Sequence, residues 1–154
     1  PVNLGRLIPN VLAVLEPLAT DKDITLLMEQ SQAVPPVLGD PHMLEEVFTT
    51  LVDNAIKHNQ PKTKIVAEIG SSDGMATIRI SDNGSGIRPE KVDRIFEAGV
   101  REGGAAASAG TGMGLYIAKL LAESQGGDIS AESELGKGSV FTVKLPTAQN
   151  RDED

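Results

Sequence analysis

The sequence predicts an α+β fold, a two-layer α/β sandwich in which about three helices cover one face of a mixed, mainly antiparallel sheet. Three stretches of the chain carry apolar residues at helical spacing, and stretches that alternate apolar and polar residues lie between and after them. The resulting order is helix, strand, helix, two strands, helix, two strands. With 154 residues and 40% hydrophobic content, the chain can form one compact domain around one core.

An opening helix is indicated by six apolar residues at helical spacing: Leu4, Ile8, Val11, Leu12, Leu15 and Leu18. Pro9 and Pro17 fall within the same stretch, and they leave the limits of the helix open because proline lacks a backbone donor. Residues 24–30, with the sequence ITLLMEQ, then predict a strand.

A second helix follows, and its pattern is the most regular in the chain. Asp40 and Pro41 form a start signal. The helix that they introduce carries one apolar stripe: Leu44, Val47, Phe48, Leu51 and Ala55. Residues 62–70 and 75–81 then predict two strands, which the turn sequence SSDG joins into a hairpin.

The second half of the chain contains a long stretch that has few apolar side chains. After a short predicted helix with the sequence RPEKVDRIF, residues 97–112 are mostly small, and such an insert is typical of a functional lid or a disordered region. The next helix, MGLYIAKLLAESQ, is apolar nearly all round, so we expect it to be largely buried. The sequence LGKG connects a closing hairpin, and we expect a disordered tail over 147–154.

Composition excludes several classes of function. The net charge of -8 disfavours binding to nucleic acid through its phosphates, and the aromatic content of 3% disfavours base stacking. Because the chain has no cysteine, a disulfide scaffold is excluded, and its two histidines have no zinc-ligand spacing. No apolar run is long enough to cross a bilayer, so we expect this fragment not to be embedded in a membrane.

Two polar patterns stand out against these helices and strands. Glu46, Thr50, Asn54 and Lys57 form one line along the second helix, either as a solvated face or as a site in which Asn54 offers a carbonyl oxygen to magnesium. The sequence GTGMGL at 110–115 begins the next helix, either as a flexible linker or as a site where free amides bind phosphate.

In order and spacing, four stretches resemble the N, G1, F and G2 boxes of the catalytic and ATP-binding domain of sensor histidine kinases. They are EEVFTTLVDNAIKH, SDNGSGI, RIFEAGVR and GTGMGLYIAKLLAESQGGDI. The wider superfamily includes gyrase, mismatch-repair proteins and the large heat-shock chaperones. We therefore expect a histidine kinase catalytic and ATP-binding domain over 1–146, with a flexible ATP lid.

The resemblance implies a role for each residue that matches a motif. Asp82 accepts a hydrogen bond from the adenine amino group, Asn54 binds magnesium, and Lys57 lies near the phosphates. Asn54, Lys57 and Arg101 are thus the expected catalytic residues. The other expected contacts with the nucleotide are His58, Gly84, Gly86, Ile87, Phe96, Gly110, Thr111, Gly112, Met113, Gly114 and Leu115.

The sequence also departs from the family pattern. Thr50 stands where family members often have a first asparagine, and where ATPases of the superfamily have a glutamate that can activate water. His58 replaces a frequent aromatic residue, which leaves a position in the pocket and one on the surface both open. In the F box, Ala98 and Gly99 replace a common Pro-Phe pair.

The function implied by the resemblance is transfer of the γ-phosphate of magnesium-bound ATP to a histidine on a separate dimerisation domain. A response regulator would then receive the phosphate, and the full-length protein would lie in the cytoplasm or be attached to the inner membrane. We expect the isolated chain to be a monomer. Two alternatives stay open: a serine-kinase regulator that sequesters a transcription factor, and a nucleotide-gated interaction module without catalysis.

Overall fold

The computed structural model describes residues 1–30, 32–97 and 114–148, and it contains the helices and strands in the predicted order. Their bounds are α1 (Leu4–Asp21), β1 (Thr25–Gln30), α2 (Pro41–His58), β2 (Lys64–Ser72), β3 (Met75–Asp82), α3 (Pro89–Val92), α4 (Gly114–Ser124), β4 (Asp128–Glu134) and β5 (Gly138–Pro146). Of the short helix predicted over residues 88–96, residues 89–92 form α3, and residues 93–96 form turns. Most of the predicted insert, residues 98–112, lies outside the described residues.

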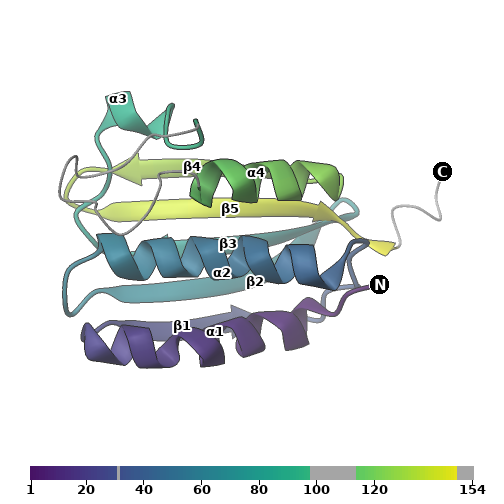
Figure 1. The fold of residues 1–154 in the computed structure, drawn as a ribbon. Helices are drawn as coiled ribbons and strands as arrows, with labels where there is room; N and C mark the ends of the chain where they lie inside the picture. Colours follow the sequence, from purple (N-terminus) through teal and green to yellow (C-terminus); the bar gives the residue numbers. More distant parts are fainter. Residues whose placement is uncertain (31, 98–113, 149–154) are drawn as a thin grey trace.

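The strands form one five-stranded sheet in the order β1-β2-β3-β5-β4. Strand β1 pairs with β2 in parallel, and the remaining neighbours are antiparallel. Figure 1 shows α1, α2 and α4 side by side over one face of this sheet. The predicted two-layer α+β fold, with a mixed and mainly antiparallel sheet, is therefore confirmed.

The core lies between the helices and the inward-facing residues of the sheet. Strand β3 shows the alternation clearly, since Ala76, Ile78 and Ile80 are buried and the residues between them are not. Helix α2 contributes the predicted stripe, and all five of its members are buried: Leu44, Val47, Phe48, Leu51 and Ala55. This packing fixes the position of α2 over the middle of the sheet.

Helix α1 contains two prolines, and α2 begins at a side-chain cap. Helix α1 continues through both Pro9 and Pro17, because its buried apolar stripe holds it against the sheet. Leu18, which we placed in that stripe, is 48% exposed. At the start of α2, Asp40 accepts hydrogen bonds from the backbone N–H groups of His42 at 2.8 Å and Met43 at 3.2 Å, as its start signal predicts.

The prediction that the helix before Gly126 is largely buried is wrong. In α4 only Ala118 and Ala122 are buried, whereas Ile117 is 40% exposed and Leu120 is 48% exposed. Helix α4 lies at one end of the helical layer, next to α2 and over β4, so only one of its sides faces the core (Figure 1). Its small alanines therefore make the close contact with the sheet.

The expected tail begins within the fold. The Thr147 side chain is 1% exposed, and its N–H and hydroxyl groups both donate to the Gly74 carbonyl oxygen at 3.0 Å. Val37 forms antiparallel bridges with Thr147 and with Val2, so three separate segments meet there. The tail prediction is thus corrected for residues 147 and 148, and residues 149–154 lie outside the described part of the chain.

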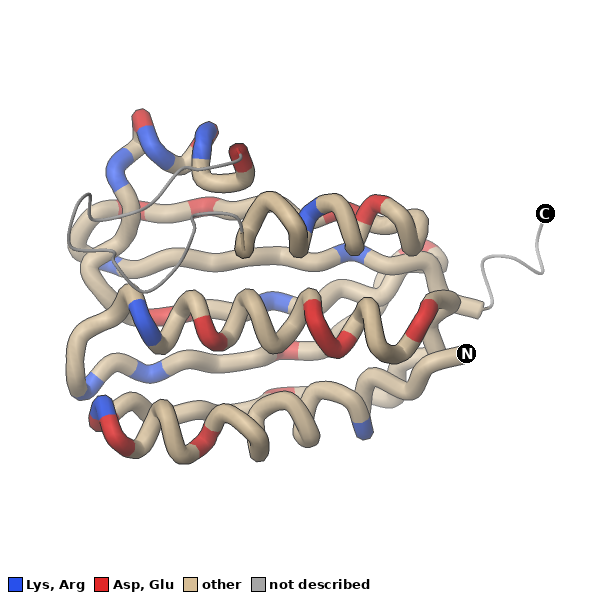
Figure 2. Tube along the Cα trace, viewed as in Figure 1, with Lys and Arg blue, Asp and Glu red and all other residues tan. Residues whose placement is uncertain are grey.

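Charged residues of both signs are distributed along the helices and strands (Figure 2). In the part of the chain that the structure describes, no helix is long and apolar enough to span a membrane.

Candidate functional site

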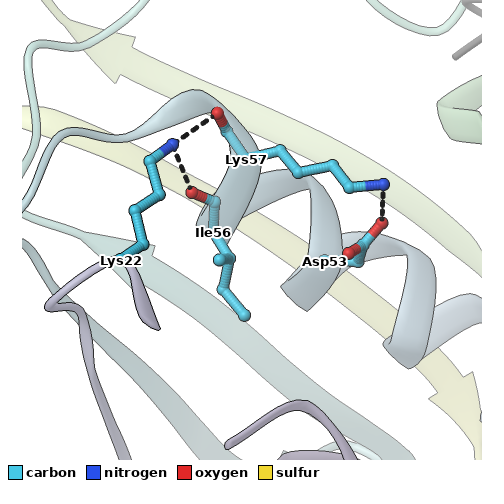
Figure 3. Close-up of polar contacts among 4 residues, drawn as sticks. All are labelled: Lys22, Asp53, Ile56 and Lys57. Carbon is cyan, nitrogen blue, oxygen red and sulfur yellow. Dashed lines mark hydrogen bonds and ion pairs between the residues drawn. The ribbon is translucent and has the colours of Figure 1, made fainter. Parts of the chain in front are cut away.

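The predicted polar line lies along one side of α2. Thr50 and Asn54 are half-buried, while Glu46 and Lys57 are exposed. The Lys57 ammonium lies 3.0 Å from a carboxylate oxygen of Asp53, one turn earlier (Figure 3). Among the described residues, the Asn54 side chain has no hydrogen-bond partner, so its amide oxygen is available to a ligand.

The C-terminal end of α2 is capped by two side chains. The Asn59 amide donates to the Ala55 carbonyl oxygen at 2.8 Å. The Lys22 ammonium donates to the carbonyl oxygens of Ile56 at 2.9 Å and Lys57 at 2.7 Å (Figure 3). His58, the last residue of the helix, is exposed.

Asp82 ends β3, where the sheet register places it between Ile65 of β2 and Ser139 of β5. It is half-buried, and one of its carboxylate oxygens accepts a hydrogen bond from the Gly84 N–H at 3.0 Å. This bond holds the carboxylate at the start of the loop that follows the strand and leaves its second oxygen able to accept from another donor.

Gly84 and Gly86 are explained by neighbours within the chain. A Cβ at Gly84 would overlap the Asn59 side-chain oxygen, and a Cβ at Gly86 would overlap the Glu134 carbonyl oxygen. Gly86 also has a φ of +80°, which favours glycine. In the structure Gly84 admits the Asn59 side chain at the end of α2, and Gly86 admits the end of β4; their contact with a nucleotide stays a prediction.

Ile87 and Phe96 follow this loop, and both are partly buried against the core. The Ile87 N–H donates to the Ser133 hydroxyl at 2.6 Å. The Phe96 ring packs edge to face on Phe141, with ring centroids 6.1 Å apart, and the Lys119 ammonium lies 5.0 Å from the centroid of the Phe96 ring.

Helix α4 begins beside α2. A Cβ at the exposed Gly114 would lie 3.4 Å from the Thr50 methyl group, and Leu115 packs partly against the core. The remaining predicted site residues lie outside the described residues: Arg101, Gly110, Thr111, Gly112 and Met113.

The loop after β3 and the start of α4, which are far apart in sequence, therefore both contact α2 or the residue that follows it. Gly114 lies against Thr50, and Gly84 lies against Asn59. Thr50 and Asn59 are nine residues apart, which corresponds to about 14 Å along the helix axis. Asn54, with its available amide, lies between them.

The Asn54 amide fits a magnesium ion that takes most of its ligands from water and from phosphate oxygens. Within the described residues, no group of three or more His, Asp or Glu side chains could hold a metal ion. Magnesium usually keeps several waters and takes few protein ligands when phosphate oxygens are present. The Asn54 amide oxygen is a suitable protein ligand for such a site.

The family model of the histidine kinase-, DNA gyrase B- and HSP90-like ATPases matches residues 39–149, which is more than half of the chain. The chain belongs to this ATPase family. Within it, Sensor protein SrrB of Staphylococcus aureus is 36% identical over 109 residues, covering 70% of this chain and 19% of that protein. The chain thus spans about a fifth of the length of the curated relatives it matches.

Solved structures place this ATPase domain among the histidine kinases. Full-length ShkA in complex with AMPPNP has a TM-score of 0.84 and 28% identity, over 96% of this chain and 31% of that one. The nucleotide-free catalytic domain of the histidine kinase ThkA has a TM-score of 0.82 and 25% identity, over 95% of each chain. The chain is therefore a histidine kinase-type ATPase domain, as we predicted.

Sequence reasoning missed four residues that shape this ATPase domain. Asn59 follows the last periodic residue of α2, which is a recognisable position for a helix cap. Lys22, Lys119 and Ser133 carry no such signal, because each acts on a group from a distant part of the chain.

Proposed function

We propose that this domain binds ATP with magnesium and presents the γ-phosphate to a histidine on a separate dimerisation domain, as the kinase part of a two-component system. Membership of the ATPase family and the likeness to histidine kinase catalytic domains support the proposal. The observation that carries it is that the start of α4 contacts Thr50, one turn before Asn54, and that the loop after β3 contacts Asn59, the residue that follows α2.

In this proposal the adenine base lies at Asp82. The carboxylate can only accept hydrogen bonds, which suits the adenine amino group and disfavours the keto oxygen that guanine carries at the same position. The bond from the Gly84 N–H to the first carboxylate oxygen orients the second one for this contact.

The phosphates would extend from there along α2 towards Gly114. Asn54 would hold the magnesium ion, which neutralises charge on the phosphate oxygens when bound. Lys57 would leave its contact with Asp53 to meet a phosphate, since the pair is half-exposed and weak. Arg101 and residues 110–113 are proposed as further phosphate contacts.

Phosphoryl transfer depends mostly on positioning and charge neutralisation, which a site of this composition can supply. The two histidines of the sequence are His42, at the start of α2, and His58, at its end. Neither matches a phosphoacceptor, so we propose that the accepting histidine belongs to another domain and that a response regulator acts downstream.

The test is to mix the chain with magnesium, radiolabelled ATP and a histidine-bearing dimerisation domain from the same kinase. Label should appear on that domain as an acid-labile adduct. Label on serine would favour a serine-kinase regulator, and ATP binding without any transfer would favour an interaction module without catalysis.

Asn54→Ala provides a test of the metal. The variant should lose most of the magnesium-dependent part of its affinity for ATP, while its affinity for ADP without metal should stay close to that of the original chain. Titration calorimetry with and without magnesium measures both. Equal losses in the two conditions would show that Asn54 acts on the fold and not on the metal.

A further inference from the structure

The last carbonyl groups of α2 are satisfied by side chains and not by a following turn of backbone. The last four carbonyls of a helix have no partner within it, and in α2 these belong to Ala55, Ile56, Lys57 and His58. Asn59 donates to the first of them, and Lys22 donates to the second and third.

Lys22 supplies two of these three bonds from another helix. It is the C-cap residue of α1, it is half-buried, and its hydrogen bonds of 2.9 and 2.7 Å reach 34 and 35 residues along the chain. A cation at a helix C-terminus is favourable because the carbonyl end carries partial negative charge. The Lys22 ammonium therefore donates hydrogen bonds to two free carbonyls and also places a positive charge beside the negative end of the helix.

The more usual way to end a helix is not used here. Asn59 has φ of -103° and ψ of 159°, which is extended backbone, so it does not form the left-handed cap that a glycine would provide. Lys57 cannot cap its own helix end either, because its side chain reaches back to Asp53 (Figure 3). The position of the last turn of α2 thus depends on Lys22.

The same turn carries the residues that the proposed site needs. Asn54 directly precedes the residues whose carbonyls are capped, and Lys57 is one of those residues. Asn59 contacts Gly84, which lies in the loop after β3 where we place the adenine base. Lys22 itself lies outside the segment that the family model matches, residues 39–149.

We propose that Lys22 is a positioning residue for the nucleotide site, acting by holding the last turn of α2 in helical form. The inference rests on the proposed function, because its consequence is measured as binding of ATP with magnesium. Lys22 touches neither nucleotide nor metal in this role.

Three variants separate this role from a general effect of charge. Lys22→Met keeps the length of the side chain and removes its donors, whereas Lys22→Arg keeps a cation that can donate to carbonyls. Lys144→Met makes the same charge change at an exposed lysine on β5, away from α2, and serves as the matched control.

The first measurement is amide hydrogen exchange without nucleotide. In Lys22→Met the amides of Lys57 and His58 should exchange about three- to tenfold faster, which corresponds to the net contribution of one ordinary hydrogen bond. Amides in β3 should be unchanged, and so should all amides in Lys144→Met. Unchanged exchange at the end of α2 would overturn the proposal whether or not the chain binds ATP.

The second measurement is calorimetric titration with ATP. Lys22→Met should lose about three- to tenfold in affinity with magnesium and a smaller factor without it, because Asn54 acts only through the metal, and Lys22→Arg should recover to within about twofold of the original chain. An equal loss in both conditions, or the same loss in Lys144→Met, would overturn the proposal. Failure of the unaltered chain to bind ATP would instead overturn the proposed function.

Discussion

Gly86 shows how one residue can be constrained by its own backbone and by a neighbour. Its φ of +80° disfavours other residues, and a Cβ there would meet the Glu134 carbonyl oxygen. Gly86→Ala should therefore lower the free energy of unfolding by about 2 to 4 kcal/mol, combining a left-handed backbone penalty with a local clash.

Gly136 is the matched control for this measurement by urea denaturation. It has a φ of +83°, but nothing lies within 4 Å of a Cβ built there. Gly136→Ala should cost only the backbone penalty of about 1 to 2 kcal/mol. Equal losses in the two variants would mean that the contact with Glu134 relaxes easily.

Asp82 should determine the choice of base. Asp82→Asn replaces an oxygen acceptor with an amide that can also donate, so binding of ATP should weaken by about 1 to 3 kcal/mol, the cost of mispairing a polar group that the bound base would cover. Titration calorimetry with ATP and GTP measures the change. Equal affinity of the unaltered chain for both nucleotides would contradict the adenine assignment.

At the scale of the element, α4 presents a face that the core does not cover. Leu120→Gln should change the free energy of unfolding by no more than about 0.5 kcal/mol, because the side chain is 48% exposed and glutamine has a similar helix propensity. Ala122→Leu should cost about 1 to 3 kcal/mol, because Ala122 is 0% exposed against the sheet. Thermal unfolding followed by circular dichroism can compare them, and a costly Leu120→Gln would indicate a covered face.

The helices and strands were predictable where the apolar residues lie on one face of the element and that face packs against the core. Every member of the α2 stripe is buried, and β3 alternates as its sequence does. Helix α4 was misjudged because apolar residues all round a helix do not show which sides have neighbours. That depends on its place at the end of the helical layer, which a local pattern cannot encode.

The motifs of the candidate site could be predicted from the sequence, but the hydrogen bonds that hold its residues in place could not. The motifs that contain Asn54, Asp82 and Gly114 could be recognised by order and spacing. The role of Lys22 could not, because its partners are backbone carbonyls, which every residue has and no sequence pattern distinguishes.

For the whole molecule, we predict that the isolated chain binds ATP but hydrolyses it very slowly. Thr50, one turn before Asn54, has a neutral hydroxyl that is a poor base, and its methyl group lies beside Gly114. Glu46 lies eight residues before Asn54, about 12 Å along the helix axis, and is exposed.

Release of phosphate from ATP by the chain alone measures this prediction, with a known ATPase as the positive control. Glu46→Gln should leave the slow rate unchanged. Rapid hydrolysis that Glu46→Gln abolishes would identify Glu46 as a general base and the chain as an ATPase of the gyrase or chaperone kind.

The bridges at Val37 join three segments that are far apart in sequence, because Val2 and Thr147 both pair with the same residue. Val37 is 0% exposed and pairs with Val2 on one side and with Thr147 on the other, and Thr147 also binds the turn at Gly74. Removing residues 1–3 would therefore expose Val37. It would also weaken the attachment of Thr147, which follows β5, although Thr147 is far from Val2 in sequence. Fragments cut to the limits of residues 39–149 would lose this closure together with α1 and the cap that Lys22 provides.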